Sequence, residues 1–257
     1  MTLIATYINK YGITFLSDSN LSTNKGNAGF GQKIFPISHL NAAVAYSGSY
    51  SVNSSPIDIW INNYITGSFH TTKTIEEFVK ELTQRLNSEM KSFELEHVTI
   101  IHIAGYHRED SQSYIQHFHI SNTGLNHDGS YSKPTSTFKF SLDFDSMSNK
   151  EHRTQLISYD FDSSFHTWFI NGLTEARICA NYIRTVLDDA LKNIWANPQT
   201  KFRKPKNIFE SATIWKINME IVCKLFKLSD HEALFVGGEI QTHLIPEPQD
   251  INKSNLQ

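Results

Sequence analysis

The chain has 257 residues, of which 39% are hydrophobic and 19% charged, and its formal net charge at pH 7 is −3. This composition can bury a large apolar core, so it excludes a disordered, collagen-like or disulfide-scaffold protein. The charge gives no electrostatic reason to expect a nucleic acid or a membrane as a partner. We expect one domain over residues 1–249, followed by a disordered tail over residues 250–257.

The two cysteines and the apolar runs indicate the cellular compartment. Cys179 and Cys223 lie inside apolar periodic stretches without CxxC or Cys/His spacing, which predicts buried, reduced thiols. No apolar run approaches the roughly 18 residues of a membrane span, and the N-terminal residues contain no basic leader. We therefore expect a cytoplasmic protein.

The first third of the chain predicts strands followed by two helices. Short apolar runs predict strands over residues 3–8, 13–16, 33–37 and 42–46, arranged as a β-meander. Ser55-Pro56 is expected to start a helix, because serine caps and proline fits the first helical position. Thr74 and Glu77 predict a capping box at the start of a second helix, and apolar residues at helical spacing follow in both segments.

The rest of the chain repeats this order. Strands are predicted over 98–104 and 114–121, helices over 174–195 and 208–226, and a last strand over 233–245. The polar segment 122–164 contains alternating residues at 138–144 and a strand-like run at 156–161, which predicts an inserted hairpin. Helix pairs that interrupt antiparallel strands bury their apolar faces on the sheets. The sequence therefore predicts an α+β fold in four layers, with two antiparallel sheets between two helix pairs.

Several other features do not indicate a ligand site. His117 and His119 lie two apart on a predicted strand and would face the same side, but no third ligand follows, so no metal is expected. Dinucleotide and P-loop glycine patterns are missing, so no cofactor is expected. The remaining charged groups are more typical of solvated faces than of binding sites. They are Asp143, Asp145, Asp160 and Asp162, and the basic loop of Lys201, Arg203, Lys204 and Lys206.

A group of residues in the first 48 positions indicates a specific chemistry. The group consists of Thr2, Gly12, Phe15, Ser17-Asp18-Ser19, Lys33 and Ser47-Gly48. It resembles the N-terminal-nucleophile (Ntn) hydrolases of the proteasome β-subunit type, and most closely the bacterial ancestral-β-subunit (Anbu) group, whose chains begin Met-Thr. The resemblance covers residues 2–48, is thinner over the helix pairs and is absent over 122–164. The layer order predicted above is the one that this family's fold requires.

The resemblance implies a threonine-type endopeptidase that acts on peptide or protein substrates as a ring or helical homo-oligomer. Thr2 would be the nucleophile once Met1 is removed, and its free α-amine would be the base. Lys33 would lower the pKa of the hydroxyl and of the amine, and Asp18 would orient that lysine. The backbone N–H of Gly48 would stabilise the oxyanion.

The sequence also departs from the family. Proteasome subunits carry an acid and a serine before a late Gly-Gly pair, whereas residues 233–238 here contain neither. Asn20 replaces the usual arginine, and Asn171-Gly172 replaces a Ser-Gly loop. Two alternatives therefore stay open. One is an Ntn amidohydrolase of a small molecule, and the other is a catalytically inactive structural subunit.

Overall fold

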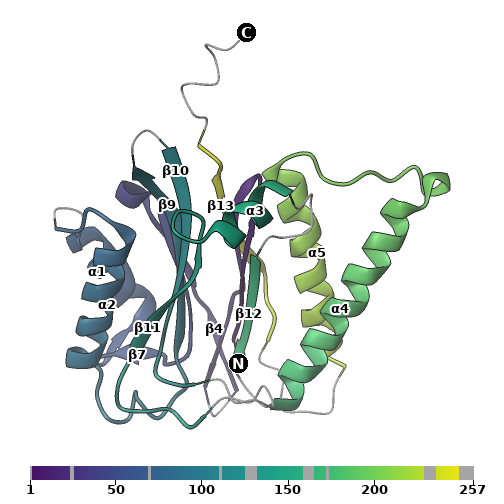
Figure 1. Cartoon of the computed structure of the whole chain (residues 1–257). Coiled ribbons are helices and arrows are strands. Elements are labelled where there is room, and N and C mark those ends of the chain that lie inside the picture. The colour runs from purple at the N-terminus through teal and green to yellow at the C-terminus, as the bar shows by residue number, and fades with distance from the viewer. Residues whose placement is uncertain are drawn as a thin grey trace.

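Two antiparallel β-sheets lie face to face in the computed structural model of the chain (Figure 1). The structure describes residues 2–23, 26–68, 71–109, 112–124, 132–158, 165–171, 174–228 and 236–248. The four-stranded sheet has the order β12 (Phe165–Asn171), β1 (Thr2–Asn9), β2 (Gly12–Asp18) and β13 (Ile240–Pro246). The five-stranded sheet has the order β11 (Lys139–Asp145), β10 (Gln112–Ser121), β9 (Ile100–Glu109), β6 (Ala42–Ser47) and β5 (Ile34–Ile37).

Helices cover the outer side of each sheet (Figure 1), and buried apolar side chains pack between the sheets. One buried cluster joins α1 (Ile57–Ser68) and α2 (Ile75–Glu89) to the five-stranded sheet. A second cluster joins α4 (Thr174–Ala196) and α5 (Ile208–Phe226) to β1 and β2. A third contains Ile4 and Phe15 from one sheet and Ala45 and Ala104 from the other. The fold is therefore mixed α/β, with antiparallel sheets flanked by helices.

The helix boundaries agree closely with the sequence signals. The Thr74 hydroxyl accepts the backbone N–H of Glu77, and the Glu77 carboxylate accepts the backbone N–H of Thr74, which is the predicted capping box. Helix α5 spans Ile208–Phe226 as predicted, and α4 ends immediately before Asn197-Pro198. Capping and apolar spacing are local properties, so they are readable without knowledge of the tertiary structure.

Two predictions for the N-terminal third are wrong. The first strands do not form one meander, because β1 and β2 belong to the four-stranded sheet and β5 and β6 to the five-stranded one. Ser55-Pro56 does not start α1 but forms β8 (Ser55–Pro56), which pairs with β7 (Ser51–Val52). The hairpin of β3 (Asn20–Thr23) and β4 (Gly26–Phe30) was not predicted, and neither was β12, which pairs with β1.

The described part of segment 122–164 contains a strand and a helix rather than two hairpin strands. Strand β11 contains the alternating residues but pairs with β10 at the edge of the five-stranded sheet. The predicted strand at 156–161 is wrong over its described residues, because Lys150–Ser158 forms helix α3. The predicted tail over 250–257 lies outside the described residues, and the single domain over 1–249 stays a prediction.

Two further findings concern membrane-spanning helices and the thiols. No helix in the described part of the chain has both the length and the apolar character needed to span a membrane. Cys223 is a buried free thiol on α5, as predicted. Burial raises the pKa of this thiol to about 12, so it stays protonated at neutral pH. The side chain of Cys179 lies outside the described residues.

Candidate functional site

Asp18 and Lys33 form a buried ion pair beside the start of β1. Asp18 is the last residue of β2, and its Oδ1 accepts hydrogen bonds from Lys33 Nζ at 2.9 Å and from the backbone N–H of Leu3 at 2.8 Å. Both side chains are inaccessible to solvent, with exposed fractions of 1% for Lys33 and 0% for Asp18. The structure therefore brings Asp18, Lys33 and the residue that follows Thr2 together through one carboxylate oxygen.

Thr2 lies at the first position of β1, at the edge of this buried pair. Its backbone pairs with Asn171 of β12, and Ile4 pairs with Ser17 of β2, so the start of β1 lies between two neighbouring strands. Leu3 is fully buried, whereas Thr2 is partly exposed. Thr2 is thus held by a rigid strand and still reachable from solvent.

Burial acts against the charge on both members of the pair. It raises the pKa of the Asp18 carboxyl and lowers the pKa of the Lys33 ammonium, and the attraction between the two groups opposes both shifts. Lys33 Nζ also donates to the carbonyl of Asn20 at 2.5 Å. The Asp18 carboxylate and the Asn20 carbonyl thus supply two hydrogen-bond acceptors for the buried ammonium.

The backbone around Lys33 is fixed by residues from both sheets. Gln241 of β13 accepts the Lys33 backbone N–H at 2.9 Å, and its amide donates to the carbonyl of Gly31 at 2.6 Å. The Lys33 carbonyl accepts the N–H of Tyr46 on β6 at 3.1 Å. Sequence reasoning missed Gln241, because a single glutamine more than 200 positions away from Lys33 gives no local signal.

Gly48 follows β6 and adopts a backbone conformation that favours glycine. Its φ is +139°, and a Cβ at this position would lie 2.4 Å from the Cα of Thr99. The next residue, Ser49, donates its N–H to the Thr99 hydroxyl at 3.0 Å. Gly48 connects to the ion pair through β6, because Tyr46 binds the Lys33 carbonyl. A side chain at position 48 would therefore displace the backbone whose N–H the resemblance assigns to the oxyanion.

The Gly237-Gly238 pair also contacts this site. The N–H of Gly237 donates to Asp18 Oδ2 at 3.1 Å, and its carbonyl accepts the N–H of Asn20 at 3.2 Å. Both glycines have positive φ, and the side chains of Ser19 and Asn20 lie against Gly238. The backbone of this turn thus supports Asp18. Residues 233–235, where the family's acid and serine are missing from the sequence, lie outside the described residues.

A cavity of about 520 Å³ opens beside the ion pair. It is lined by Ser19, Phe30, Gly31, Gln32, Gly238, Glu239 and Gln241. Gly31 and Gln241 also contribute to fixing the backbone of Lys33, but none of Thr2, Asp18, Lys33 and Gly48 lines the cavity. Its size suits a few residues of a peptide or a small molecule.

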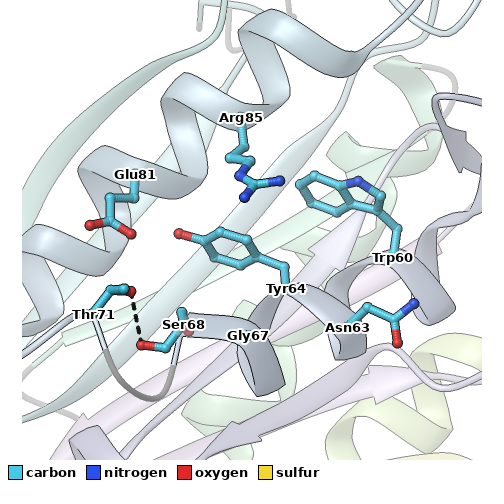
Figure 2. Close-up of a pocket in the computed structure, with 8 residues that line it drawn as sticks. All are labelled: Trp60, Asn63, Tyr64, Gly67, Ser68, Thr71, Glu81 and Arg85. Carbon is cyan, nitrogen blue, oxygen red and sulfur yellow. Dashed lines mark hydrogen bonds between the residues drawn. The ribbon is translucent and has the colours of Figure 1, made fainter.

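Another cavity, of about 340 Å³, lies between α1 and α2 (Figure 2). The ring of Tyr64 lines this cavity. It stacks on Trp60 with 5.8 Å between ring centroids and lies under the guanidinium of Arg85. The hydroxyl of Tyr64 points toward Glu81 (Figure 2). This cavity is on the helical face of the five-stranded sheet, whereas Asp18 belongs to the other sheet, so the two are separate.

The histidine pair that sequence analysis considered as metal ligands contacts an acid instead. His119 Nδ1 lies 2.8 Å and His117 Nδ1 lies 3.2 Å from the carboxylate of Asp143, so Asp143 does not belong to the expected solvated face. The ring of His117 contacts His102 edge to face at 5.3 Å, and His102 Nδ1 hydrogen bonds to the Thr6 hydroxyl at 3.2 Å. The described residues contain no group of three or more potential ligands that could hold a metal ion.

The pKa values of two histidines and of the acid in this polar cluster are all lowered, but for different reasons. Burial lowers the pKa of His102 well below its usual value and also lowers the pKa of His117. Burial opposes ionisation of Asp143 as well, but its hydrogen bonds with His117 and His119 leave the pKa of its carboxyl below the usual range. At neutral pH, His102 and His117 are therefore uncharged rings between the two sheets.

A second carboxylate, Glu94, fixes the loop that follows Gly48. Its side chain accepts the hydroxyl of Ser51 at 2.7 Å and the backbone N–H groups of Asn53, Ser54 and Lys91 at 2.8–3.0 Å. Although burial opposes the effect, these hydrogen bonds lower the pKa of Glu94. With 1% of its surface exposed, Glu94 acts as a structural anchor close to the candidate site.

Comparisons with known proteins show similarity only to solved structures. No protein-family model matches the chain, and no curated protein matches it. Among solved structures, the chain is similar to Anbu (ancestral beta-subunit) from Yersinia bercovieri, at 9% sequence identity over 96% of this chain and 81% of that chain. The TM-score of this match is 0.48. A similarity at this level does not support any statement about activity. A proposal about activity must therefore rest on the geometry of the site.

Proposed function

We propose that the chain is an amide-bond hydrolase of the proteasome-like threonine type, with Thr2 as the nucleophile after removal of Met1. The observation that carries this proposal is the shared Asp18 Oδ1, which binds the Lys33 ammonium and the backbone N–H next to Thr2. A buried ammonium near the first residue of a strand would favour ionisation of a hydroxyl placed there, which supports Thr2 as the nucleophile.

The proposed reaction begins with transfer of the Thr2 hydroxyl proton to the α-amine of Thr2. The oxygen Oγ1 then forms a bond to the carbonyl carbon of the substrate, and the positive charge of Lys33 stabilises the developing alkoxide. The N–H of Gly48 donates to the oxyanion. The C–N bond then breaks, the amine product takes the proton from the α-ammonium, and water hydrolyses the ester on Thr2.

The proposal extends to the architecture. The succession of α1 and α2, the five-stranded sheet, the four-stranded sheet, and α4 and α5 supports assignment to the four-layer αββα Ntn-hydrolase fold, with residues 1–249 as one domain. An open peptidase would digest cytoplasmic proteins without control. We therefore infer a cytoplasmic ring or helical homo-oligomer that encloses the site and admits peptide or unfolded protein substrates.

The first test is the intact mass of the purified protein with direct identification of its N-terminal residue. Loss of Met1 would provide the free amine that the reaction requires. Retention of Met1 in protein from its own cells would remove the base from the reaction and favour the inactive structural subunit.

The second test uses variants of the nucleophile. Thr2→Ala should abolish hydrolysis of acyl substrates, Thr2→Ser should retain part of it, and Thr213→Ala, at an exposed threonine of α5, should leave it unchanged. Unchanged turnover by Thr2→Ala would refute catalysis at Thr2. Sedimentation at micromolar concentration separates the peptidase from the small-molecule amidohydrolase, because a stable monomer would contradict an enclosed site.

A further inference from the structure

The side-chain amide of Gln241 takes the place of a missing strand partner for residues 31–33. These residues lie between β4 and β5 and are not part of a strand. Gln241 Oε1 accepts the N–H of Lys33 at 2.9 Å, and Nε2 donates to the carbonyl of Gly31 at 2.6 Å. A carboxamide has one acceptor and two donor hydrogens, so it binds the backbone as a peptide group of a neighbouring strand would.

The opposite side of Lys33 is held as well. Its carbonyl accepts the N–H of Tyr46, and the N–H of Gly31 donates to the carbonyl of Ser19. The peptide groups on both sides of the Lys33 Cα are therefore fixed. The anchored backbone fixes the point from which the flexible side chain reaches Asp18 and the Asn20 carbonyl, so a shift of the Lys33 Cα would strain or lengthen these hydrogen bonds.

We propose that Gln241 is a positioning residue for Lys33, acting through the backbone of residues 31–33. This inference rests on the proposed function in one respect only: the position of the ammonium affects rate only if Thr2 is the nucleophile. The anchoring of Lys33 by Gln241 is testable by itself. Gln241 also faces Ser17, the residue before Asp18, and its Oε1 accepts the Ser17 hydroxyl at 3.4 Å.

A side-chain amide at position 241 matches the hydrogen-bonding groups of Gly31 and Lys33, which are one carbonyl and one N–H. A carboxylate at position 241 could accept the Lys33 N–H but would repel the Gly31 carbonyl, which needs a donor. A protonated carboxyl offers one donor and one acceptor, as the amide does. Gln241→Glu should therefore behave like the wild type when its carboxyl is protonated and like a broken anchor when it is ionised, whereas Gln241→Met has neither donor nor acceptor at any pH.

The activity experiment measures acylation of Thr2 by a β-lactone probe in the full-length protein. Oγ1 attacks the lactone carbonyl, the ring C–O bond breaks, and the released alkoxide takes a proton, so labelling adds the mass of the probe. Gln241→Met should slow acylation by about 10–100-fold, the range expected when a reacting group is misplaced by about 1 Å. The rate of Gln241→Glu relative to wild type should rise as pH falls from 8 to 5.

The matched control is Gln112→Met. Gln112 is the first residue of β10, and its Oε1 accepts the hydroxyl of Tyr114 at 2.6 Å, so the control loses one hydrogen bond of a glutamine side chain away from Lys33 and from the residues that line the cavity. It should acylate at the wild-type rate. A flat Gln241→Glu ratio across the pH range, or an equal loss in Gln112→Met, would overturn the positioning role.

A second measurement does not depend on Thr2 chemistry. Acetic anhydride labelling with peptide mass analysis compares Lys33, which is buried, with Lys73, which is exposed. Gln241→Met should raise the labelling of Lys33 relative to Lys73 by at least about fivefold if opening of the anchored loop costs about 1 kcal/mol less. If the wild type never reacts with the β-lactone but Lys33 becomes exposed in Gln241→Met, the proposed function fails and the anchoring stands. If Lys33 stays protected, the anchoring fails.

Discussion

The buried ion pair predicts an unequal loss of stability when either partner is removed. Asp18→Ala leaves the Lys33 ammonium without its counter-charge and also leaves the N–H groups of Leu3 and Gly237 without their acceptor. Lys33→Met removes one donor from a carboxylate that retains two backbone donors. The aspartate variant should therefore lose more free energy of unfolding than the lysine variant.

The magnitudes follow from the number of groups that lose a partner. An uncompensated buried charge costs about 3–5 kcal/mol, and each unsatisfied buried N–H adds about 1 kcal/mol or more. We expect a loss of about 5 kcal/mol for Asp18→Ala. For Lys33→Met we expect about 2–3 kcal/mol, because Asp18 retains its two backbone donors. At roughly 2–4 °C per kcal/mol, the aspartate variant should melt about 10–20 °C below the wild type.

The assay is urea unfolding at pH 7.5, followed by the fluorescence of the tryptophans that pack on the four-stranded sheet. The control is Asp189→Ala, at an exposed position of α4, which should change the free energy of unfolding by less than about 0.5 kcal/mol. The reasoning is refuted if Lys33→Met costs as much as Asp18→Ala, or if both variants lie within 1 kcal/mol of the wild type, roughly the scale of one net hydrogen bond.

Three further predictions concern residues around the site. The ring of His102 is neutral in the folded protein and takes up a proton in the unfolded chain below about pH 6.5. The free energy of unfolding therefore falls as pH drops, by up to about 1.4 kcal/mol per pH unit for this group. Urea titrations between pH 7.5 and 5 should show a shallower fall for His102→Gln, and equal slopes in the two proteins would contradict this. Glu94→Ala leaves three backbone N–H groups without their acceptor and should lower the free energy of unfolding in urea by about 3 kcal/mol. The control Glu96→Ala, at an exposed position, should lower it by less than about 0.5 kcal/mol, and similar losses in the two variants would show that Glu94 does not anchor the loop. Gly48→Ala should lower the free energy of unfolding by at least about 2 kcal/mol, because its Cβ would overlap Thr99. The control Gly67→Ala, in open space on α1, should be neutral or stabilising by up to about 1 kcal/mol. A fully stable Gly48→Ala would show that the backbone there can adapt.

Local signals predicted α1, α2, α4 and α5, with the start of α1 misplaced, but they missed α3 and predicted the sheets less well. The capping box at Thr74 and the ends of α5 depend on residues within a few positions of each other, so the sequence contains all the information. The assignment of β2 and β5 to different sheets depends on pairing partners far along the chain, β13 for the first and β6 for the second. Strand β12 escaped prediction for the same reason, because its partner β1 is more than 150 positions earlier.

The same distinction explains which parts of the candidate site were predicted. Asp18 and Lys33 were identified because their positions relative to Thr2 resemble a known family, and the structure places the two in contact. Gln241 and Glu94 belong to no such pattern. A single polar residue gives no sign in the sequence that it will accept or donate several hydrogen bonds to distant backbone.

The orientation of Asp143 shows how tertiary context can reverse the meaning of a pattern. Alternating acids on β11 predicted a solvated face, because one side of an edge strand usually contacts water. The neighbouring strand β10 presents His117 and His119 on the side that Asp143 faces, so the acid points toward two bases. Histidines that appeared to be candidate metal ligands and an acid that appeared to be a surface residue are thus one cluster. That cluster reaches β1, because His102, whose ring contacts His117, hydrogen bonds to the Thr6 hydroxyl.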